Sequence, residues 1–171
     1  MPFEVFVSVG SNVEPAHNLR WGLEQLMRRF GALRVSPVYR NAPVGFRGDD
    51  FYNLVVAFDT EDSPRAVSEA LDGMENLCGR NRSGERYGPR TLDLDLLLHG
   101  ATIMNEPGLV LPRPDLVRYA FMLGPLAALA GDRRHPVSGE TFAALWSRFD
   151  QASHPLVEVE LPGLRETRAE A

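Results

Sequence analysis

Two aspartates, Asp93 and Asp95, alternate with leucines in a short run that reads LDLDLLL over residues 92–98. Side chains of a β-strand alternate between its two faces, so both carboxylates would share one face, with Cα atoms about 6.6 Å apart, and the even-numbered leucines would share the other. Carboxylates at this spacing can bracket a pair of Mg²⁺ ions, and without a cation they would repel each other. Two aspartates alone, however, are more typical of a solvated strand face.

Arginines crowd the segment just before this strand. Residues 80–91 contain Arg80, Arg82, Arg86 and Arg90, and Gly88-Pro89 predicts a turn that fixes the direction of Arg90. All 18 basic residues of the chain are arginine, so anions must be recognised by guanidinium groups or backbone N–H groups. Acids for metal beside guanidiniums for phosphate form the charge pattern that a Mg-nucleotide requires. Residues 87–98 therefore predict the Mg²⁺ and triphosphate site of a phosphoryl- or pyrophosphoryl-transfer enzyme.

Other side chains could shape a pocket around such a site. Asn53 and Glu75 are the polar groups of interest, and the turn at residues 10–12 (GSN) could present N–H groups to a ligand, although a plain strand-to-helix turn is at least as common. Several aromatic residues could stack on a planar ligand, although each is individually more typical of the core: Tyr39, Phe51, Tyr52, Tyr87 and Phe121. The four histidines lack metal-ligand spacing, so zinc is not expected.

Composition favours a single small cytoplasmic domain. The chain has 171 residues, a single cysteine (Cys78) and no apolar run near the roughly 20 residues that span a bilayer. Its N-terminus lacks the basic start of a signal peptide. A net charge of −5 argues against nucleic-acid or membrane binding as the main task.

The elements that must position these residues follow from periodicity and turn signals. We expect strands at residues 3–9, 33–40, 51–60 and 92–98, and a hairpin or extended segment at 101–111. Helices are expected at residues 15–30, from Ser63-Pro64 to Gly79, at 115–130 with a break at Gly124-Pro125, and at 139–149. The loops at 41–50 and 80–91 are long enough to be functional. This order of elements favours the α+β class, with an antiparallel sheet covered by helices.

Residues 86–98 (RYGPRTLDLDLLL) strongly resemble the signature of the 6-hydroxymethyl-7,8-dihydropterin pyrophosphokinase family. Further pieces occur in the family's order: VGSN at 9–12, YR at 39–40 with PVG at 43–45, FYN at 51–53 and AFML at 120–123. The resemblance covers residues 4 to about 149. It implies a ferredoxin-like, three-layer α-β-α fold in one domain, residues 1–150, followed by an extension, residues 151–171. It also implies that a pterin hydroxymethyl oxygen attacks the β-phosphorus of ATP and that AMP leaves, a step of folate biosynthesis.

The resemblance also assigns roles by position. Its expected partners are ATP and a dihydropterin, with two Mg²⁺ ions as cofactors and a monomer as the expected state. Asp93 and Asp95 would ligate both ions. The expected catalytic set is Arg80, Arg82, Arg90, Asp93 and Asp95. The pterin would contact Gly10, Val44, Asn53, Tyr87 and Phe121. The nucleotide would contact Glu75, Arg80, Arg82, Arg90, Arg113 and Arg118.

The sequence departs from the family pattern on the nucleotide side. Arg113 stands where the family has histidine, and Gly108 and Tyr119 stand where it has arginine, with Arg118 beside the latter. These departures leave two alternatives open: a diverged paralogue that acts on a related pterin, and a non-catalytic protein that binds a pterin or a nucleotide. Formation of AMP from ATP and 6-hydroxymethyldihydropterin separates the pyrophosphokinase from both.

Overall fold

The computed structural model describes residues 1–43, 48–80, 92–161 and 164, and of Arg80 it describes the backbone alone. The strands are β1 (Phe3–Ser11), β2 (Arg34–Val35), β3 (Val38–Asn41), β4 (Phe51–Thr60), β5 (Asp93–His99), β6 (Met104–Glu106), β7 (Leu109–Leu111) and β8 (Val157–Val159). The helices are α1 (Pro15–Phe30), α2 (Pro64–Arg80), α3 (Ala120–Ala130) and α4 (Phe142–Arg148), with a 3₁₀ turn, η1, at Pro114–Val117.

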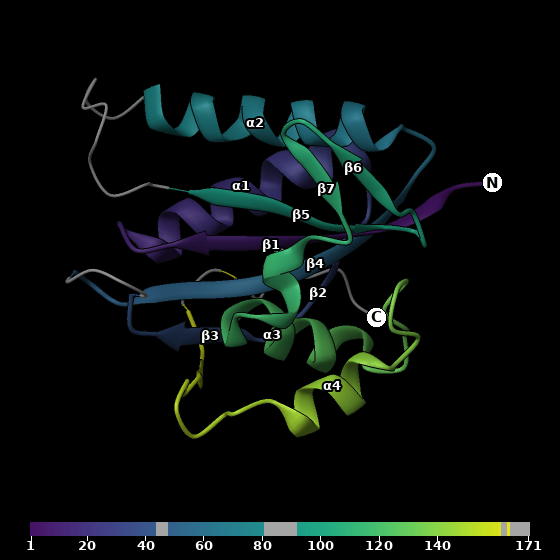
Figure 1. Ribbon diagram of the computed structural model, residues 1–171. Helices are drawn as coiled ribbons and strands as arrows, with labels where there is room; N and C mark the ends of the chain where they lie inside the picture. Colours follow the sequence, from purple (N-terminus) through teal and green to yellow (C-terminus); the bar gives the residue numbers. More distant parts are fainter. Residues whose placement is uncertain (44–47, 81–91, 162–163, 165–171) are drawn as a thin grey trace.

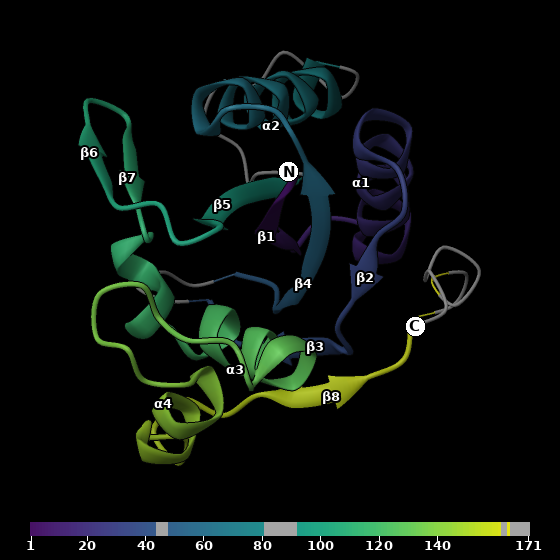
Figure 2. The same ribbon diagram turned by 90° about the vertical axis from the view of Figure 1, so that its right-hand side faces the viewer.

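These elements form three layers around one antiparallel sheet. Within the described residues the strand order is β5-β1-β4-β3-β8, and the short β2 pairs with β4 alongside β3. Helices α1 and α2 cover one face of the sheet, α3 covers the other, and α4 packs on the outer side of α3 (Figures 1 and 2). The hairpin of β6 and β7 stands beside α2. The predicted α+β arrangement, an antiparallel sheet flanked by helices, is confirmed.

The first helical layer follows the predicted sequence signals closely. Leu19, Leu23 and Leu26 repeat at helical spacing in α1 and are fully buried against the sheet. The helix ends at Gly31, whose φ of 86° is strained for any residue with a Cβ. The Ser63 Oγ accepts a hydrogen bond from the Ala66 N–H at 3.1 Å, which is the expected N-cap of α2. This helix continues one residue past the predicted end, to Arg80.

The second helical layer corrects two predictions. Residues 115–130 are interrupted at Arg118 and Tyr119, between η1 and α3, and not at Gly124-Pro125, which lies within α3. Proline removes one helical hydrogen bond at a cost of about 3 kcal/mol, and burial of the apolar α3 between the sheet and α4 outweighs this cost. The last helix begins at Phe142, because the Thr141 side chain accepts a hydrogen bond from the Ala144 N–H and caps it there.

The segment after residue 150 contributes to the sheet. Strand β8 pairs antiparallel with β3, Val157 facing Arg40 and Val159 facing Val38. This three-residue strand was not predicted from the sequence. The proposed division at residue 150 into a domain and an extension remains a prediction. None of the helices in the described part of the chain is long and apolar enough to cross a membrane.

Candidate active site

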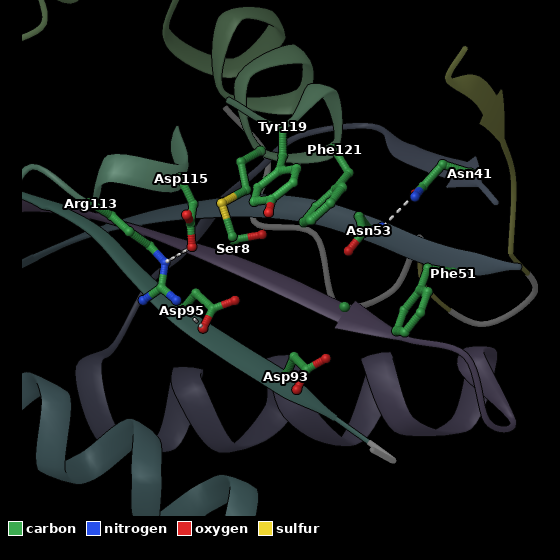
Figure 3. Close-up of a pocket in the computed structure, with 12 residues that line it drawn as sticks. Ser8, Asn41, Phe51, Asn53, Asp93, Asp95, Arg113, Asp115, Tyr119 and Phe121 are labelled. Atoms are coloured by element: carbon green, nitrogen blue, oxygen red, sulfur yellow. Dashed lines mark hydrogen bonds and ion pairs between the residues drawn. The ribbon is translucent and has the colours of Figure 1, made fainter. Parts of the chain in front are cut away.

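The two aspartates of β5 lie on the face of the sheet that α3 covers, beside polar positions of the central strands. In the sheet register Asp95 pairs with Ser8, and Asp93 pairs with Gly10, which pairs on its other side with Asn53 of β4. Asp93 and Asp95 both line a cavity whose opposite wall includes Phe121 and Met122 of α3, and Figure 3 shows the two side chains along β5. The prediction that both carboxylates share one face is therefore confirmed.

The predicted alternation of the leucines holds only up to Leu96. Leu92, Leu94 and Leu96 are buried on the side of α1 and α2. Leu97 is then an extra residue, since Val7 pairs with Leu96 and Phe6 with Leu98. This β-bulge turns Leu98 to the α3 side, together with Leu97.

A cavity of about 270 Å³, the α3-side cavity, opens between the sheet and the start of α3. Its floor is formed by strand residues: Ser8, Gly10, Asn53, Asp93 and Asp95. Its roof is formed by residues at the start of α3: Tyr119, Phe121 and Met122. Its sides are formed by Asn41, Phe51, Arg113 and Asp115. The rings of Tyr119 and Phe121 stack with centroids 5.2 Å apart and planes 17° apart. This cavity combines aromatic walls with a buried carboxamide and three carboxylates, a lining suited to a planar polar ligand.

Asn53 is held from two sides at the floor of this cavity. The residue is 5% exposed, and its Nδ2 donates a hydrogen bond to Asn41 Oδ1 at 2.6 Å. Its Oδ1 lies directly over Gly10, where a Cβ would overlap it. Glycine at position 10 is therefore required for the observed position of the Asn53 amide.

Arg113 stands at one end of the floor, between two carboxylates. Its guanidinium lies 3.4 Å from Asp95 Oδ1 through Nη2 and 3.5 Å from Asp115 Oδ2 through Nε. Its backbone N–H donates to the carbonyl of Leu97 at 3.0 Å, so the β-bulge of β5 anchors it beside Asp95. The arrangement places one cation next to the predicted metal ligands.

A second cavity, the α2-side cavity, measures about 230 Å³ and lies between α2, β5 and the β6–β7 hairpin. Asp72 and Glu75 line it from α2, Gly108 and Val110 from the hairpin, and Asp95 and Arg113 belong to both cavities. The Glu75 Oε2 accepts a hydrogen bond from the Leu94 N–H at 2.8 Å, which ties α2 to β5. The two cavities thus meet at Asp95 and Arg113.

The structure brings together a large part of the predicted site. Glu75 lines the α2-side cavity. The α3-side cavity is lined by six of the predicted residues: Gly10, Asn53, Asp93, Asp95, Arg113 and Phe121. Arg118 lines neither, with a side chain 68% exposed and 4.0 Å from Asp115. Val44, Arg82, Tyr87 and Arg90 lie outside the described residues, as does the side chain of Arg80.

Sequence reasoning also missed residues of the site. Five residues line the α3-side cavity but were not assigned to the site from the sequence: Ser8, Asn41, Asp115, Tyr119 and Met122. Strand parity could have found Ser8, which shares the face of Gly10 on β1. Among the aromatic candidates Phe51 and Phe121 line this cavity, whereas Tyr52 packs against the core on the α1 side and Tyr39 lines a separate groove beside α4.

The donor chemistry of the floor suits a hard cation. Asp93 and Asp95 offer carboxylate oxygens, the ligand type of Mg²⁺, which retains several waters and substrate phosphate oxygens in its shell. Within residues 1–43, 48–80 and 92–161, no cluster of three or more His, Cys, Asp or Glu side chains could hold a metal by itself. The two aspartates therefore fit a cation that arrives with phosphate, as in a Mg-nucleotide.

Comparison with known proteins identifies the family of this chain. The model of the family described as 7,8-dihydro-6-hydroxymethylpterin-pyrophosphokinase (HPPK) matches residues 6–131. A 2-amino-4-hydroxy-6-hydroxymethyldihydropteridine pyrophosphokinase of Pseudomonas aeruginosa is 40% identical over 136 residues, which are 77% of this chain and 83% of that protein. The enzyme of the same name from Methylorubrum extorquens is 34% identical over 157 residues, 90% of this chain and 98% of that protein.

A solved structure supports the fold. Wild-type HPPK-DHPS of Plasmodium falciparum superposes with a TM-score of 0.71 at 12% sequence identity, covering 86% of this chain and 45% of that one. This chain thus spans less than half of that protein, and the likeness concerns the ferredoxin-like fold alone. Together with the family match and the bacterial relatives, it leads to one conclusion. The chain belongs to the 7,8-dihydro-6-hydroxymethylpterin-pyrophosphokinase family, transferases of folate biosynthesis.

Proposed function

We propose that this chain transfers pyrophosphate from ATP to 6-hydroxymethyl-7,8-dihydropterin where its two cavities meet. The observation that carries the proposal is that Asp95 and Arg113 line both cavities. In a two-substrate transfer, the acceptor and the phosphate donor must meet where protein groups can balance the charge of the phosphates. The shared border of the cavities supplies such a point, with a carboxylate and a guanidinium side by side.

The α3-side cavity is assigned to the pterin. Phe121 and Phe51 offer aromatic surfaces to a flat ring, and the Asn53 carboxamide offers hydrogen bonds to its edge. The ring would lie above Gly10, with its hydroxymethyl group directed to the β5 side of the floor. Val44 and Tyr87 complete the proposed pterin contacts.

The α2-side cavity is assigned to ATP. Its polar lining between Glu75 and the hairpin receives the nucleoside end, and Arg113 receives the phosphates at the border. Arg80, Arg82 and Arg90 are also proposed to contact the triphosphate. Arg118 is the weakest member of this set, because its guanidinium is mostly exposed and lines neither cavity.

Asp93 and Asp95 are proposed to hold two Mg²⁺ ions that arrive with the triphosphate. When bound, these ions would neutralise charge on the phosphates during transfer. The ion pair of Asp95 with Arg113 gives this carboxylate a counter-charge within the protein. Asp95 would exchange that guanidinium for the cation, and Arg113 would then be available to phosphate.

The reaction forms a bond between the hydroxymethyl oxygen and the β-phosphorus and breaks the bond from this phosphorus to the α-phosphate oxygen, so AMP leaves. The hydroxyl proton passes to water as the ester forms, and the electrons of the broken bond leave with the α-phosphate oxygen of AMP. The residues contribute mainly by orienting the two substrates and balancing charge, the two effects that provide most of the rate acceleration in phosphoryl transfer. We also propose that the enzyme acts in the cytoplasm, as its single cysteine favours, and as a monomer, since one chain supplies both cavities.

Product analysis tests the proposal directly. The protein is incubated with Mg-ATP and 6-hydroxymethyl-7,8-dihydropterin, and the products are identified by ³¹P NMR and chromatography. We expect AMP and a pterin diphosphate in equal amounts. The matched control is 6-methyl-7,8-dihydropterin, which lacks the attacking hydroxyl and should yield no AMP. Formation of ADP, or tight pterin binding without AMP, would contradict the proposed transfer.

A further inference from the structure

We propose that Asn41 is a positioning residue for the acceptor, because it fixes the carboxamide of Asn53 with Oδ1 turned to the α3-side cavity. This inference rests on the proposed function, in which Asn53 contacts the pterin ring. Asn41 itself comes from β3, a different strand from Asn53. The two are diagonal neighbours, since Tyr39 pairs with Asn53 and Asn41 pairs with Phe51, and diagonal side chains on one face of a sheet are within reach of each other.

The direction of the hydrogen bonds is set by a backbone group. Asn41 Nδ2 donates to the carbonyl oxygen of Ala42 at 3.1 Å. A carbonyl oxygen only accepts hydrogen bonds, so the amide nitrogen of Asn41 must face it. This leaves Asn41 Oδ1 for Asn53, and the group of Asn53 that faces this oxygen must be its donor, Nδ2, at 2.6 Å. Figure 3 shows this contact as a dashed line between the two side chains.

Gly10 completes the constraint from the opposite side. With Nδ2 directed to Asn41, the Asn53 Oδ1 takes the space above Gly10 that a Cβ would fill. Asn53 is nearly completely buried, so its amide is held by protein on both sides before any ligand arrives. The position and the polarity of this amide are therefore both determined by neighbouring strands.

Because the positions of Oδ1 and Nδ2 are fixed, the Asn53 amide can bind only a ligand edge with a matching order of donors and acceptors. Oδ1 accepts from a ring N–H, and the second hydrogen of Nδ2 remains for a ring acceptor beside it. An aminopyrimidinone ring carries such neighbouring donors and acceptors. Without Asn41, the Oδ1 and Nδ2 of Asn53 could exchange places by rotation about χ2. Asn53 Nδ2 would then face the ring N–H, so that two donors meet. A buried polar group without a matching partner costs binding free energy.

The test is a double-mutant cycle on dihydropterin binding. Dissociation constants of 6-hydroxymethyl-7,8-dihydropterin are measured by calorimetry for the wild type, Asn41→Ala, Asn53→Ala and the double variant, together with both KM values. We expect Asn41→Ala to weaken dihydropterin binding about tenfold while the KM for ATP stays within twofold. In the Asn53→Ala background the same change should cost less than twofold. Asn41→Asp keeps an acceptor for Asn53 Nδ2 but sets its second oxygen against the Ala42 carbonyl, so it should restore only part of the lost affinity.

The controls separate positioning from a structural role. Asn105→Ala removes an exposed asparagine from β6, outside both cavities, and should leave binding and thermal stability unchanged. Wild-type dihydropterin affinity in Asn41→Ala would overturn the proposal. An equal loss in the Asn53→Ala background would overturn it too, because Asn41 would then act independently of Asn53. Absence of AMP formation by the wild type would refute the proposed transfer instead, and the binding cycle would still decide the role of Asn41.

Discussion

Replacing Gly10 by alanine should damage acceptor binding more than it damages the fold. The new Cβ would overlap Asn53 Oδ1, while the next atoms, Asn53 Cγ and the Tyr52 carbonyl oxygen, are 3.4 and 3.8 Å away. Strand β1 is paired on both sides, with β4 and with β5, so its backbone has little freedom to move away. The Asn53 side chain must therefore rotate, and it then loses its hydrogen bond to Asn41.

The magnitude follows from these two effects. Crowding in a packed interior costs about 1–3 kcal/mol of the free energy of unfolding, a moderate part of the roughly 5–15 kcal/mol of a typical domain. The ligand loses one or two hydrogen bonds to Asn53, each worth about 1–1.5 kcal/mol. We therefore expect the KM for dihydropterin to rise about tenfold to hundredfold, and the KM for ATP to stay within about twofold.

Steady-state kinetics with each substrate varied in turn provides the assay, and thermal unfolding reports the stability. Gly73→Ala is the matched control: Gly73 lies inside α2, and a Cβ there meets no atom within 4 Å. Alanine at this helical position should raise the free energy of unfolding by about 0.5–1 kcal/mol without changing either KM. A Gly10→Ala enzyme with the wild-type KM for dihydropterin would refute the reasoning about Asn53.

Three further perturbations probe the site and the fold. Asp95→Ala should abolish Mg²⁺-dependent AMP formation at all Mg²⁺ concentrations. It should shift Tm by only a few degrees, because a partly exposed ion pair contributes at most about 1 kcal/mol to stability. Full activity of this variant would exclude Asp95 as a metal ligand. Tyr119→Ala should weaken dihydropterin binding about threefold to tenfold through the lost ring contact, with Tyr119→Phe close to wild type; an unchanged calorimetric Kd in the alanine variant would contradict this. The hydrogen bond and charge of Arg133 hold the pKa of Glu4 below its ordinary value of 4.5, so this stabilisation exists above that value and is lost as pH falls through the folded pKa. Glu4→Gln should accordingly lower Tm near pH 7 and have little effect near pH 2.5; an equal drop at both pH values would show that Glu4 acts through packing.

The placement of the aspartates could be predicted from the sequence because strand parity is a local property. Asp93 and Asp95 must share a face in any regular strand, and the structure places them as expected. The bulge at Leu97 could not be predicted, since it depends on how β1 pairs with β5. It also determines the position of Arg113, whose backbone N–H bonds to the Leu97 carbonyl.

The residues that the sequence did not reveal are those brought in by tertiary contacts. Asn41 looks like a loop residue until β3 pairs with β4 and sets it diagonal to Asn53. Tyr119 interrupts the predicted helix because its backbone is extended between η1 and α3, which places its ring over the cavity. The continuous helix through Pro125 likewise reflects burial of α3, a tertiary effect that outweighs the local preference.

Strand β8 has a consequence for self-association. A strand at the edge of a sheet offers unpaired N–H and C=O groups to any other chain, and proteins protect such edges with short strands, charges and prolines. Here β8 covers β3, and β8 is itself only three residues long, with Glu158 at its centre and Pro155 just before it. A shortened chain that lacks β8 would expose the longer β3 edge to intermolecular pairing. The tendency of this enzyme to self-associate at high concentration thus depends on the protection of β3, the same strand that carries Asn41.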